Sequence, residues 1–465
     1  MLDKIRQHAI SGPDSIAYKI GDESISYRCL LEKADSYAEI LRNQGNSPVM
    51  LYGRKRINTV VCILACIIAK RAYIPIDTSI PISRVENIIS IAGVGLVLTD
   101  ENIAINNIPC VSLDDLQSAV ISKADGARES DTAYIIFTSG TTGEPKGVPI
   151  SNDNLSNFVS WISSLRPLCD YEKANVMNQA QFCFDLSVAD LYYSLCNGHK
   201  LISYEADKGT VAEFIKSNDI NVAVITPTFA RLCLLDDKFC KEHCPSLKCI
   251  YFCGETLEKK TVSRLFQRFP NLRIINAYGP TEATSAVSAS GITPAMLESS
   301  SSLPIGDCDS FATEIFIDND EIILRGKSVF GGYINFDSKN SYNDGQNCYR
   351  TGDLGYIKDG KLYYVGRKDS QIKYKGYRIE LGDIESNLMK IDGVIESAAI
   401  AKKDGNFVKA IWAYVVVENN VDETQLKAQL SMLVPDYMVP KKIKIIDKMP
   451  INSNNKIDRR ALEKL

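Results

Sequence analysis

The chain has 465 residues, enough for about two or three domains with a sizeable core. Its hydrophobic content of 45% and charged content of 24% are ordinary for a globular protein. A net charge of −4 gives no sign of non-specific binding to nucleic acid. The most apolar segment, residues 59–69, is far shorter than the roughly 20 residues of a membrane span, so we expect no membrane partner.

Cysteine usage indicates the compartment. The chain has 14 cysteines and 3 histidines, and no two cysteines form a Cys-x-x-Cys pair. A zinc site at Cys240, His243 and Cys244 is an alternative, but so few histidines favour reduced, buried thiols. The first residues are polar and do not resemble a secretion signal. Together these features predict a cytoplasmic protein.

The first 300 residues alternate between strand and helix patterns. Alternating polarity, helical spacing and short apolar runs predict a strand–turn–strand over 16–27, a helix over 30–41, a strand over 49–52, a core helix over 59–69, and strands over 72–77 and 93–98. Strands that alternate with helices are typical of mostly parallel sheets covered on both faces. We therefore predict an α/β fold for this part of the chain.

The pattern changes near residue 367. The elements become short and mixed, with strands predicted over 371–374, 398–402 and 410–417 and helices over 381–389 and 423–433. This composition is typical of a small α+β lid. We therefore predict a body over residues 1–367 and a mobile lid over 368–465, with Asp369 at the hinge between them.

A run of small residues over 138–147 follows an apolar strand pattern at 133–137. Glycine lets the backbone turn sharply and present N–H groups, and the hydroxyls and one lysine add donors and positive charge. The candidate phosphate-binding residues are Thr138, Ser139, Gly140, Thr141, Thr142 and Lys146. The spacing differs from that of the common P-loop, since Pro145 stands where the second glycine would be. A flexible surface loop is the alternative.

Asp185 lies among aromatic and apolar residues in the run Phe184-Asp185-Leu186-Ser187. A carboxylate there is costly unless it meets a cation, and the ammonium group of a ligand would serve. The alternative is an aspartate that caps the helix expected to start near Val188. The residues alone leave both possibilities open.

The run over residues 274–284 combines several ligand-binding side chains. Tyr278 offers a ring to stack on a base, and Asn276 offers an amide for its edge. Thr281 offers a hydroxyl to a phosphate, and Glu282 offers a hard oxygen ligand suited to Mg²⁺. A Gly-Pro turn before a capped helix would explain only Gly279 and Pro280.

Two further segments carry candidate nucleotide contacts. Gly254 follows a predicted strand, and its bare backbone allows a flat ring to approach. Asp353 comes at the end of another strand, where an acidic residue can accept both ribose hydroxyls. Arg367 would add a donor to the ribose. A turn aspartate and an exposed arginine are the alternative for the last two.

These motifs, taken together and in this order, resemble those of the adenylate-forming enzymes, which include acyl-CoA synthetases, luciferases and the adenylation domains of peptide synthetases. The resemblance extends from about residue 10 to residue 465. It implies a large α/β body of mostly parallel sheets with a small mobile lid, and ATP and Mg²⁺ as cofactors. It also favours the ammonium partner for Asp185, because Phe-Asp-x-Ser is similar to the motif that holds the α-amino group of an amino-acid substrate.

The resemblance assigns roles residue by residue. It implies ATP binding by Thr138, Ser139, Gly140, Thr141, Thr142, Lys146, Gly254, Glu255, Asn276, Ala277, Tyr278, Gly279, Pro280, Thr281, Asp353, Tyr364, Gly366, Arg367 and Lys456. It implies substrate binding by Asp185, Cys253, Ser285 and Lys456, magnesium binding by Glu282, and catalysis by Lys456, Thr281 and Glu282. Lys456 would bridge the substrate carboxylate and the α-phosphate. Asn455 stands before it where the family has glycine, and asparagine tolerates the same turn.

Among the subgroups, the segments 226–233, 252–255 and 278–284 resemble most those of stand-alone D-alanine–carrier-protein ligases. Ser285 replaces a small apolar residue of that group, so serine or glycine is an alternative substrate. The resemblance implies activation of a small amino acid by ATP and its transfer to a separate, phosphopantetheinylated carrier protein. An acyl- or aryl-CoA ligase of the same superfamily and a catalytically inactive scaffold are the other hypotheses; Asp185 argues against the first, and Glu282, Asp353 and Lys456 argue against the second.

Overall fold

The computed structural model describes residues 1–465 except 102, 104, 106–107, 115, 117–130, 141–142, 207, 299–301, 308–312, 335, 405–406, 419–420 and 452–456. The chain divides into two compact units. The first consists of Met1–Asp77, Gly93–Ile136 and Val148–Gly366, and the second of Thr78–Ala92, Phe137–Gly147 and Arg367–Leu465. The predicted division into 1–367 and 368–465 stays a prediction, because the second unit also includes two segments from earlier in the chain.

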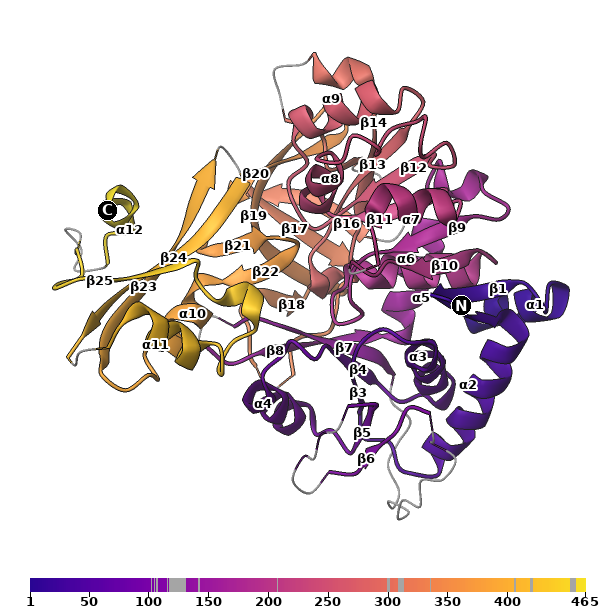
Figure 1. The fold of residues 1–465 in the computed structure, drawn as a ribbon, viewed down its shortest axis with the longest axis horizontal. Helices are drawn as coiled ribbons and strands as arrows, with labels where there is room; N and C mark the ends of the chain where they lie inside the picture. The colour runs from indigo at the N-terminus through magenta and orange to yellow at the C-terminus, as the bar shows by residue number, and fades with distance from the viewer. Residues whose placement is uncertain are drawn as a thin grey trace. The chain divides into compact units, whose positions relative to one another are not determined.

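An eight-stranded sheet forms the centre of the first unit (Figure 1). Its strands in spatial order are β14 (Ser288–Ile292), β13 (Arg273–Tyr278), β12 (Cys249–Phe252), β11 (Val222–Ile225), β9 (Asn175–Asn178), β10 (Lys200–Ser203), β1 (Ile16–Ile20) and β2 (Glu23–Ser26). The six strands from β13 to β1 pair in parallel, and the two edge strands pair antiparallel. Strands β11 and β12 are buried along their whole length, as expected for a sheet covered on both faces.

A second sheet of six strands has the order β6 (Cys110–Val111), β5 (Leu96–Thr99), β3 (Val49–Tyr52), β4 (Tyr73–Ile76), β7 (Thr132–Thr138) and β8 (Lys146–Ser151). Its pairs from β6 to β7 are parallel. The core helix α3 (Ile57–Ala69) contacts strands of both this sheet and the first one. That position explains why α3 is apolar on every side: residues Thr59 to Ala69 are all buried.

The remaining strands of the first unit form an antiparallel sheet: β15 (Gly306–Asp307), β20 (Lys361–Arg367), β19 (Asn347–Lys358), β17 (Glu321–Gly326) and β16 (Thr313–Asp318), with β18 (Ser341–Asn343) beside β19. The other helices of this unit are α1 (Leu2–Ser11), α2 (Tyr27–Arg42), α5 (Asn152–Ser164), α6 (Leu186–Cys196), α7 (Val211–Ser217), α8 (Pro227–Cys233) and α9 (Lys259–Arg268), with short 3₁₀ turns at Leu168–Asp170, Thr281–Ala283 and Pro294–Leu297.

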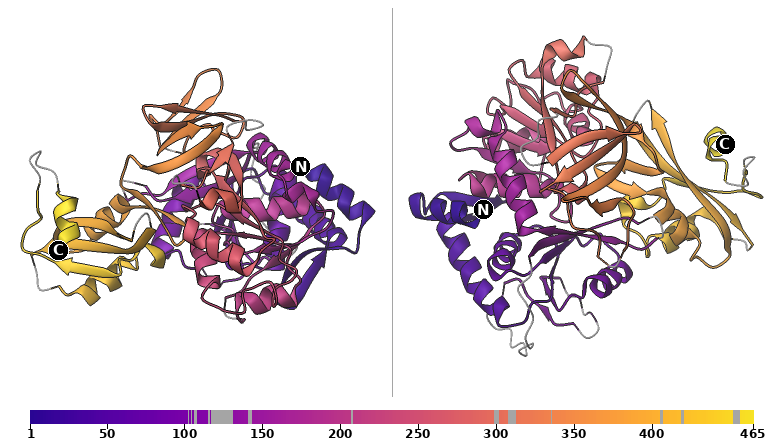
Figure 2. Two further views of the ribbon diagram at one scale, coloured as in Figure 1. Left: turned by 90° about the horizontal axis from the view of Figure 1, so that it is seen from above. Right: turned by 180° about the vertical axis from the view of Figure 1, so that it is seen from behind.

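The second unit contains two small sheets (Figure 2). They are the hairpin β21 (Gln371–Tyr374) with β22 (Tyr377–Glu380), and the order β23 (Val394–Asp404), β24 (Phe407–Val417), β25 (Lys442–Ile445). Its helices are α4 (Ile82–Ala92), α10 (Leu381–Leu388), α11 (Glu423–Leu430) and α12 (Arg459–Lys464), with a 3₁₀ turn at Asp436–Met438. Alternate residues of β24 enter two cores: Ala413 and Val415 pack with α10 and α11, whereas Tyr414 packs with α12.

The fold class predicted from the sequence is confirmed, and so are the early strands and helices, with shifted ends. The helix predicted over 30–41 runs from Tyr27 to Arg42, because Ser26 caps it by accepting a hydrogen bond from the backbone N–H of Cys29. Strands β23 and β24 are both longer than predicted because they pair along most of their length. In the described part of the chain, no helix is long and apolar enough to cross a membrane.

The 13 described cysteines are all free thiols. Burial raises the pKa of Cys66, Cys196 and Cys249, each to about 12, so these three are neutral core residues. No metal-binding group of three or more His, Cys, Asp or Glu occurs among the residues that the structure describes. Cys244 is buried and Cys240 is half-buried, and the preference for reduced thiols over a zinc site at these residues stays a prediction.

His199 makes the stability of the first unit dependent on pH. It is 1% exposed, and its Nδ1 accepts a hydrogen bond from the backbone N–H of Ala174 at 3.2 Å. Burial lowers the pKa of His199 from 6.5 to about 4. Between these values the unfolded chain binds a proton that the folded chain does not, so stability is lost as the pH falls. We expect the change in the free energy of unfolding from pH 7 to pH 5, measured by urea denaturation, to be less unfavourable in His199→Gln than in the wild type. Equal differences in both proteins would contradict this assignment.

Candidate functional site

Four neighbouring parallel strands place the sequence motifs at one edge of the eight-stranded sheet. Strands β9, β11, β12 and β13 run in the same direction, so their carboxyl ends lie side by side. The segments that leave these ends contain Asp185, Thr226, Gly254 and Thr281. Ligands of open α/β sheets bind outside the carboxyl ends of such strands, so this edge is the candidate site of the first unit.

Asp185 and Thr281 are joined at this edge, although 96 residues separate them in sequence. The hydroxyl of Thr281 donates to the Oδ2 atom of Asp185 at 2.7 Å. Asp185 occupies the N-cap position of α6 but makes no side-chain cap hydrogen bond. The capping alternative is therefore wrong for the side chain, and the helix begins at Leu186, earlier than the sequence suggested. The half-buried carboxylate is turned instead toward the segment that follows β13.

Tyr278 and Asp353 form a second link between distant motifs. The hydroxyl of Tyr278 donates to Oδ2 of Asp353 at 2.7 Å, and the two residues are 5% and 2% exposed. Beside them, the amide nitrogen of Asn276 donates to the main-chain oxygen of Pro304 at 2.8 Å. A hydrogen bond between Asn276 and a ligand would therefore have to use the second N–H or the oxygen of its side-chain amide. Ala277 is buried between these two residues on β13.

Glu282 is fully buried and is held by a tyrosine that the sequence motifs did not reveal. The hydroxyl of Tyr333 donates to Oε1 of Glu282, and it also lies 3.1 Å from the hydroxyl of Tyr349. The main-chain oxygen of Glu282 accepts from the backbone N–H of Phe330 at 2.9 Å. Tyr333 follows two glycines in a segment whose sequence gave no sign of a carboxylate partner, so only the fold identifies this contact.

The turn around Gly279 is too tight for any other residue. A Cβ atom there would lie 2.5 Å from the Cα of Ala286. Thr284 and Ser285 both adopt positive φ values, 60° and 70°, which non-glycine residues rarely do. Ser285 is 2% exposed, and its hydroxyl finds no hydrogen-bond partner within the described part of the chain.

Cys253 and Glu255 flank Gly254, which has a φ of 92°. The thiol of Cys253 lies 3.8 Å from the main-chain oxygen of Ser285, so these two predicted substrate-binding residues are neighbours. Glu255 accepts a hydrogen bond from the backbone N–H of Thr228 at 2.8 Å, which ties the segment after β12 to the start of α8. The first unit thus brings together all of its predicted residues that follow β9, β12 and β13.

The other predicted phosphate-binding residues fall in the second unit. Thr138 ends β7, Lys146 begins β8, and Thr141 and Thr142 lie outside the described residues, as does Lys456. The hydroxyl of Ser139 donates to the main-chain oxygen of Arg378 at 3.1 Å and accepts from the backbone N–H of Glu380 at 2.9 Å. A Cβ atom on Gly140 would lie 2.1 Å from the main-chain oxygen of Glu144, so the loop requires glycine there.

The predicted ribose and hinge residues meet near the end of β20. Arg367 donates to both carboxylate oxygens of Asp369, at 2.7 and 2.6 Å. Tyr364 and Gly366 belong to the same strand, and Pro280 lies between β13 and the turn that contains Thr281. The predicted hinge residue is therefore bound by the predicted ribose-binding arginine, a pairing that neither sequence motif indicates by itself.

Lys55 belongs to none of the sequence motifs described above. It is 8% exposed, and its Nζ atom donates to the main-chain oxygens of Asn178 at 3.2 Å and Gln179 at 3.1 Å. These residues begin the segment that leads to Asp185. Asp190, on α6, is fully buried and accepts from the amide of Asn178 at 2.9 Å. Burial lowers the pKa of Lys55 and raises the pKa of Asp190.

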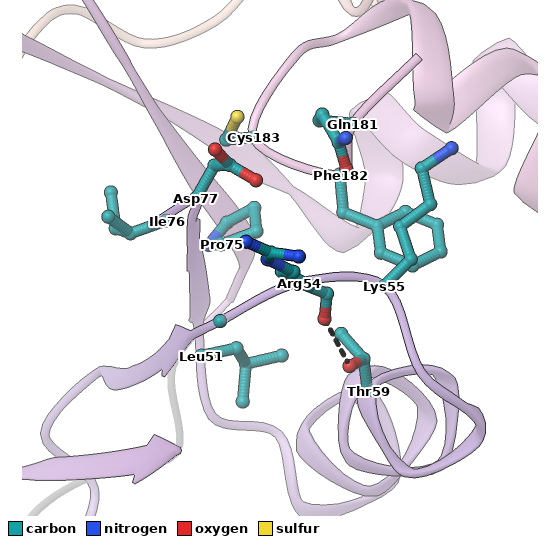
Figure 3. Close-up of a pocket in the computed structure, with 11 residues that line it drawn as sticks. Leu51, Arg54, Lys55, Thr59, Pro75, Ile76, Asp77, Gln181, Phe182 and Cys183 are labelled. Atoms are coloured by element: carbon teal, nitrogen blue, oxygen red, sulfur yellow. Dashed lines mark hydrogen bonds between the residues drawn. The ribbon is translucent and has the colours of Figure 1, made fainter. Parts of the chain in front are cut away.

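The segment that Lys55 contacts also lines a small hollow of about 10 Å³. Gln181, Phe182 and Cys183 form one wall, and the strand end at Pro75–Asp77 forms the other. Figure 3 shows Arg54 directed into the hollow and Lys55 directed away from it, alongside Phe182. Lys55 binds main-chain oxygens at the start of the segment that leads to Asp185, so we predict that it is a positioning residue for this segment.

Comparison with known families and sequences extends over nearly the whole chain. Residues 5–334 match the family described as AMP-binding enzyme, and residues 383–456 match the AMP-binding enzyme C-terminal domain. The D-alanine--D-alanyl carrier protein ligase of Listeria monocytogenes serotype 4a (strain HCC23) is 38% identical, over 99% of this chain and 98% of its own length. The ligase of the same name from Bacillus licheniformis is 35% identical, over 100% of this chain and 99% of its own length.

Solved structures share the fold at lower identity. The Vibrio cholerae adenylation domain AlmE, in complex with glycyl-adenosine-5'-phosphate, has a TM-score of 0.83 at 23% identity, over 100% of this chain and 97% of its own. The o-succinylbenzoate CoA synthetase of Bacillus subtilis has a TM-score of 0.85 at 22% identity, over 99% and 98%. At this level of identity the two structures support the same architecture and nothing finer.

The contacts of Lys55 predict its contribution to stability. Lys55→Met removes the Nζ donor from the main-chain oxygens of Asn178, which keeps the backbone N–H of Tyr204, and of Gln179, so we expect it to lower the free energy of unfolding by about 1–3 kcal/mol. Lys33→Met, at an exposed position of α2, serves as the control and should change it by less than about 0.5 kcal/mol. Urea denaturation of the two variants measures both effects. Equal losses would show that Lys55 does not hold the Asp185 segment.

Proposed function

Because the chain belongs to the AMP-binding enzyme family, we propose that it uses ATP to activate D-alanine and then transfers the D-alanyl group to a carrier protein. Use of ATP follows from the family. The amino acid and the carrier are those named for relatives that match essentially from end to end, at 35–38% identity. The thiol that accepts the D-alanyl group is the phosphopantetheine of the carrier, supplied by a separate protein.

The observation that carries this proposal is the hydrogen bond between Asp185 and Thr281. A threonine hydroxyl has one proton, which here is directed at the carboxylate. An amino-acid ammonium, being charged, makes a stronger partner for Asp185 and would displace that hydroxyl. Thr281 would then be free to donate its proton to a phosphate oxygen. Binding of the amino acid and stabilisation of the phosphate are in this way coupled through one side chain.

For the nucleotide, we propose that Tyr278 stacks on the adenine and that Asp353 accepts the ribose hydroxyls. The hydrogen bond between these two residues keeps them close to one another. Gly254 and Glu255 complete the base pocket, and the loop over 138–147 binds the phosphates. Arg367 adds a donor to the ribose.

Glu282 has the chemistry to hold Mg²⁺. Its carboxylate is buried and oriented by Tyr333, and Mg²⁺ is commonly bound through one or two carboxylates together with substrate phosphates. When bound, the ion would neutralise charge on the phosphates. The residues of this chain do the rest: Thr281 donates to the α-phosphate, and Lys456 adds a positive charge to the same group.

In the first step, the carboxylate of D-alanine attacks the α-phosphorus and pyrophosphate leaves, which forms the aminoacyl-adenylate. In the second step, the carrier thiol attacks the acyl carbon and AMP leaves. We propose that a body over 1–367 and a lid over 368–465 change arrangement between the steps, with Asp369 at the hinge. The free thiols are compatible with a cytoplasmic location, where thiols stay reduced.

Amino-acid-dependent exchange between ATP and pyrophosphate tests the first step. We expect exchange with D-alanine, and much less with L-alanine, glycine, D- or L-serine and benzoate. Asp185→Asn should raise the KM for D-alanine by about 10–100-fold, because the ammonium loses its charged partner, whereas the KM for ATP should change little. Exchange driven by benzoate but by no amino acid would contradict the proposal and identify an aryl-activating enzyme instead.

Lys456→Ala tests the role carried over to the lysine near the C-terminus. We expect the exchange rate to fall by about 10²–10³-fold, by analogy with the loss of one donor to a developing anion. Circular dichroism and the urea midpoint should remain as in the wild type, since Lys456 is assigned no part in the core. Lys448→Ala, an exposed lysine eight positions earlier, is the control. Exchange that survives in Lys456→Ala would remove this residue from the mechanism.

A further inference from the structure

The second unit has a lysine-rich hollow on its three-stranded sheet that belongs to none of the motifs above. It is lined by Lys402, Lys409, Ala410, Trp412, Glu423, Lys441 and Lys442. The hollow is open to solvent and has a volume of about 430 Å³, enough to receive a side chain. Neither the nucleotide nor the amino acid has been assigned a residue here, so the proposed catalytic steps leave this surface unexplained.

The floor of the hollow is a tryptophan surrounded by lysines. The Nζ atoms of Lys402, Lys444 and Lys442 lie 4.7, 5.0 and 5.4 Å from the centre of the Trp412 ring. The sheet register causes this cluster, since Trp412 pairs with Ile400 on one side and with Lys442 on the other. Lys402 also donates to the main-chain oxygen of Glu463 at 2.6 Å and Lys444 to that of Leu465, and cation–π attraction to the ring adds to these contacts.

Ala410 creates the space beside the tryptophan. It stands two residues before Trp412 on β24, opposite Lys402. Its short side chain leaves room between larger neighbours. The hollow therefore results from the register in which β23 and β24 pair.

The negative charges around the hollow are already paired. Glu423 forms an ion pair with Lys427 at 2.8 Å and accepts from the backbone N–H of Ile443 at 3.1 Å. Asp404 pairs with Lys409 at 3.2 Å. Lys441 and Lys442 are both exposed. The hollow is therefore strongly positive on a chain whose net charge is −4, and it complements an anionic partner.

The shape and the charge of the hollow indicate which anionic partner fits. A membrane surface is planar and would need an aromatic side chain that projects, whereas Trp412 is half-buried under lysines. A concave basic surface suits acidic side chains that project from a folded protein. The proposed second step requires such a protein to arrive and leave in each turnover, and charge complementarity accelerates encounters of this kind.

We propose that this hollow docks an acidic face of the carrier protein. The inference rests on the proposed function and adds to it the surface that recognises the carrier. Lys441 and Lys442 contact carboxylates of the carrier at the rim, and Lys402 with Trp412 receives a side chain in the hollow. The surface acts on binding of the carrier alone, without a part in formation of the adenylate.

The test separates docking from chemistry. The probe is the phosphopantetheine-bearing D-alanyl carrier protein of Listeria monocytogenes, and the variant is Lys441→Glu/Lys442→Glu. We expect the KM for this carrier to rise about tenfold or more, because two attractive charges become repulsive. D-alanine-dependent exchange, and transfer to free pantetheine, should stay as in the wild type. Lys33→Glu/Lys260→Glu reverses two exposed charges of the first unit and is the matched control.

A second measurement does not depend on the charge-reversed protein being stable. The chain has only two tryptophans, so Trp161→Phe leaves Trp412 as the single reporter. Its fluorescence should change on titration with the carrier, and the apparent Kd should rise with salt.

An unchanged KM together with unchanged fluorescence would overturn the docking site while exchange still supports the proposed function. Absence of exchange in the wild type would instead refute the proposed function. If Trp412 fluorescence changed with anionic lipid vesicles but not with the carrier, the partner would be a membrane, and the proposal would also be overturned.

Discussion

The arrangement of the first unit depends on the parallel alignment of β9, β11, β12 and β13. Parallel strands end at a common edge, so segments that are far apart in sequence leave the sheet next to one another. The contact between Asp185 and Thr281 is one result, and the contact between Cys253 and Ser285 is another. The proposed amino-acid site therefore combines side chains from the ends of three of these strands, β9, β12 and β13.

Three candidate carboxylates in the first unit accept hydrogen bonds from neutral hydroxyl groups. Tyr278 orients Asp353, Tyr333 orients Glu282, and Thr281 orients Asp185. A hydroxyl holds a carboxylate in position without bringing a positive charge of its own, so a ligand ammonium or a metal ion would interact with the carboxylate more strongly than the hydroxyl does. An arginine in the same places would compete with those ligands, since a bidentate ion pair is much harder to displace. This preference for hydroxyl partners suits a site that must bind and release charged molecules.

Electrostatic interactions differ in range between the lysine-rich hollow and the candidate catalytic residues. At the strand ends, carboxylates are buried or half-buried and interact over short distances with neighbouring side chains. Around Trp412, exposed ammonium groups act through water over about one Debye length, roughly 8–10 Å. The first arrangement suits selection of a small ligand, and the second suits recruitment of a macromolecular partner that must also leave.

The sequence by itself determined the α/β class, the order of most elements and the family, because apolar periodicity and glycine-rich motifs are local properties of the chain. It predicted Asp185, Thr281 and Glu282 as site residues but left open whether Asp185 caps a helix. Only the tertiary structure decided that question, and only it identified Tyr333, Lys55 and the lysines around Trp412. Their roles come from partners tens to hundreds of residues away, and such pairings arise from strand order and burial, which no local pattern encodes.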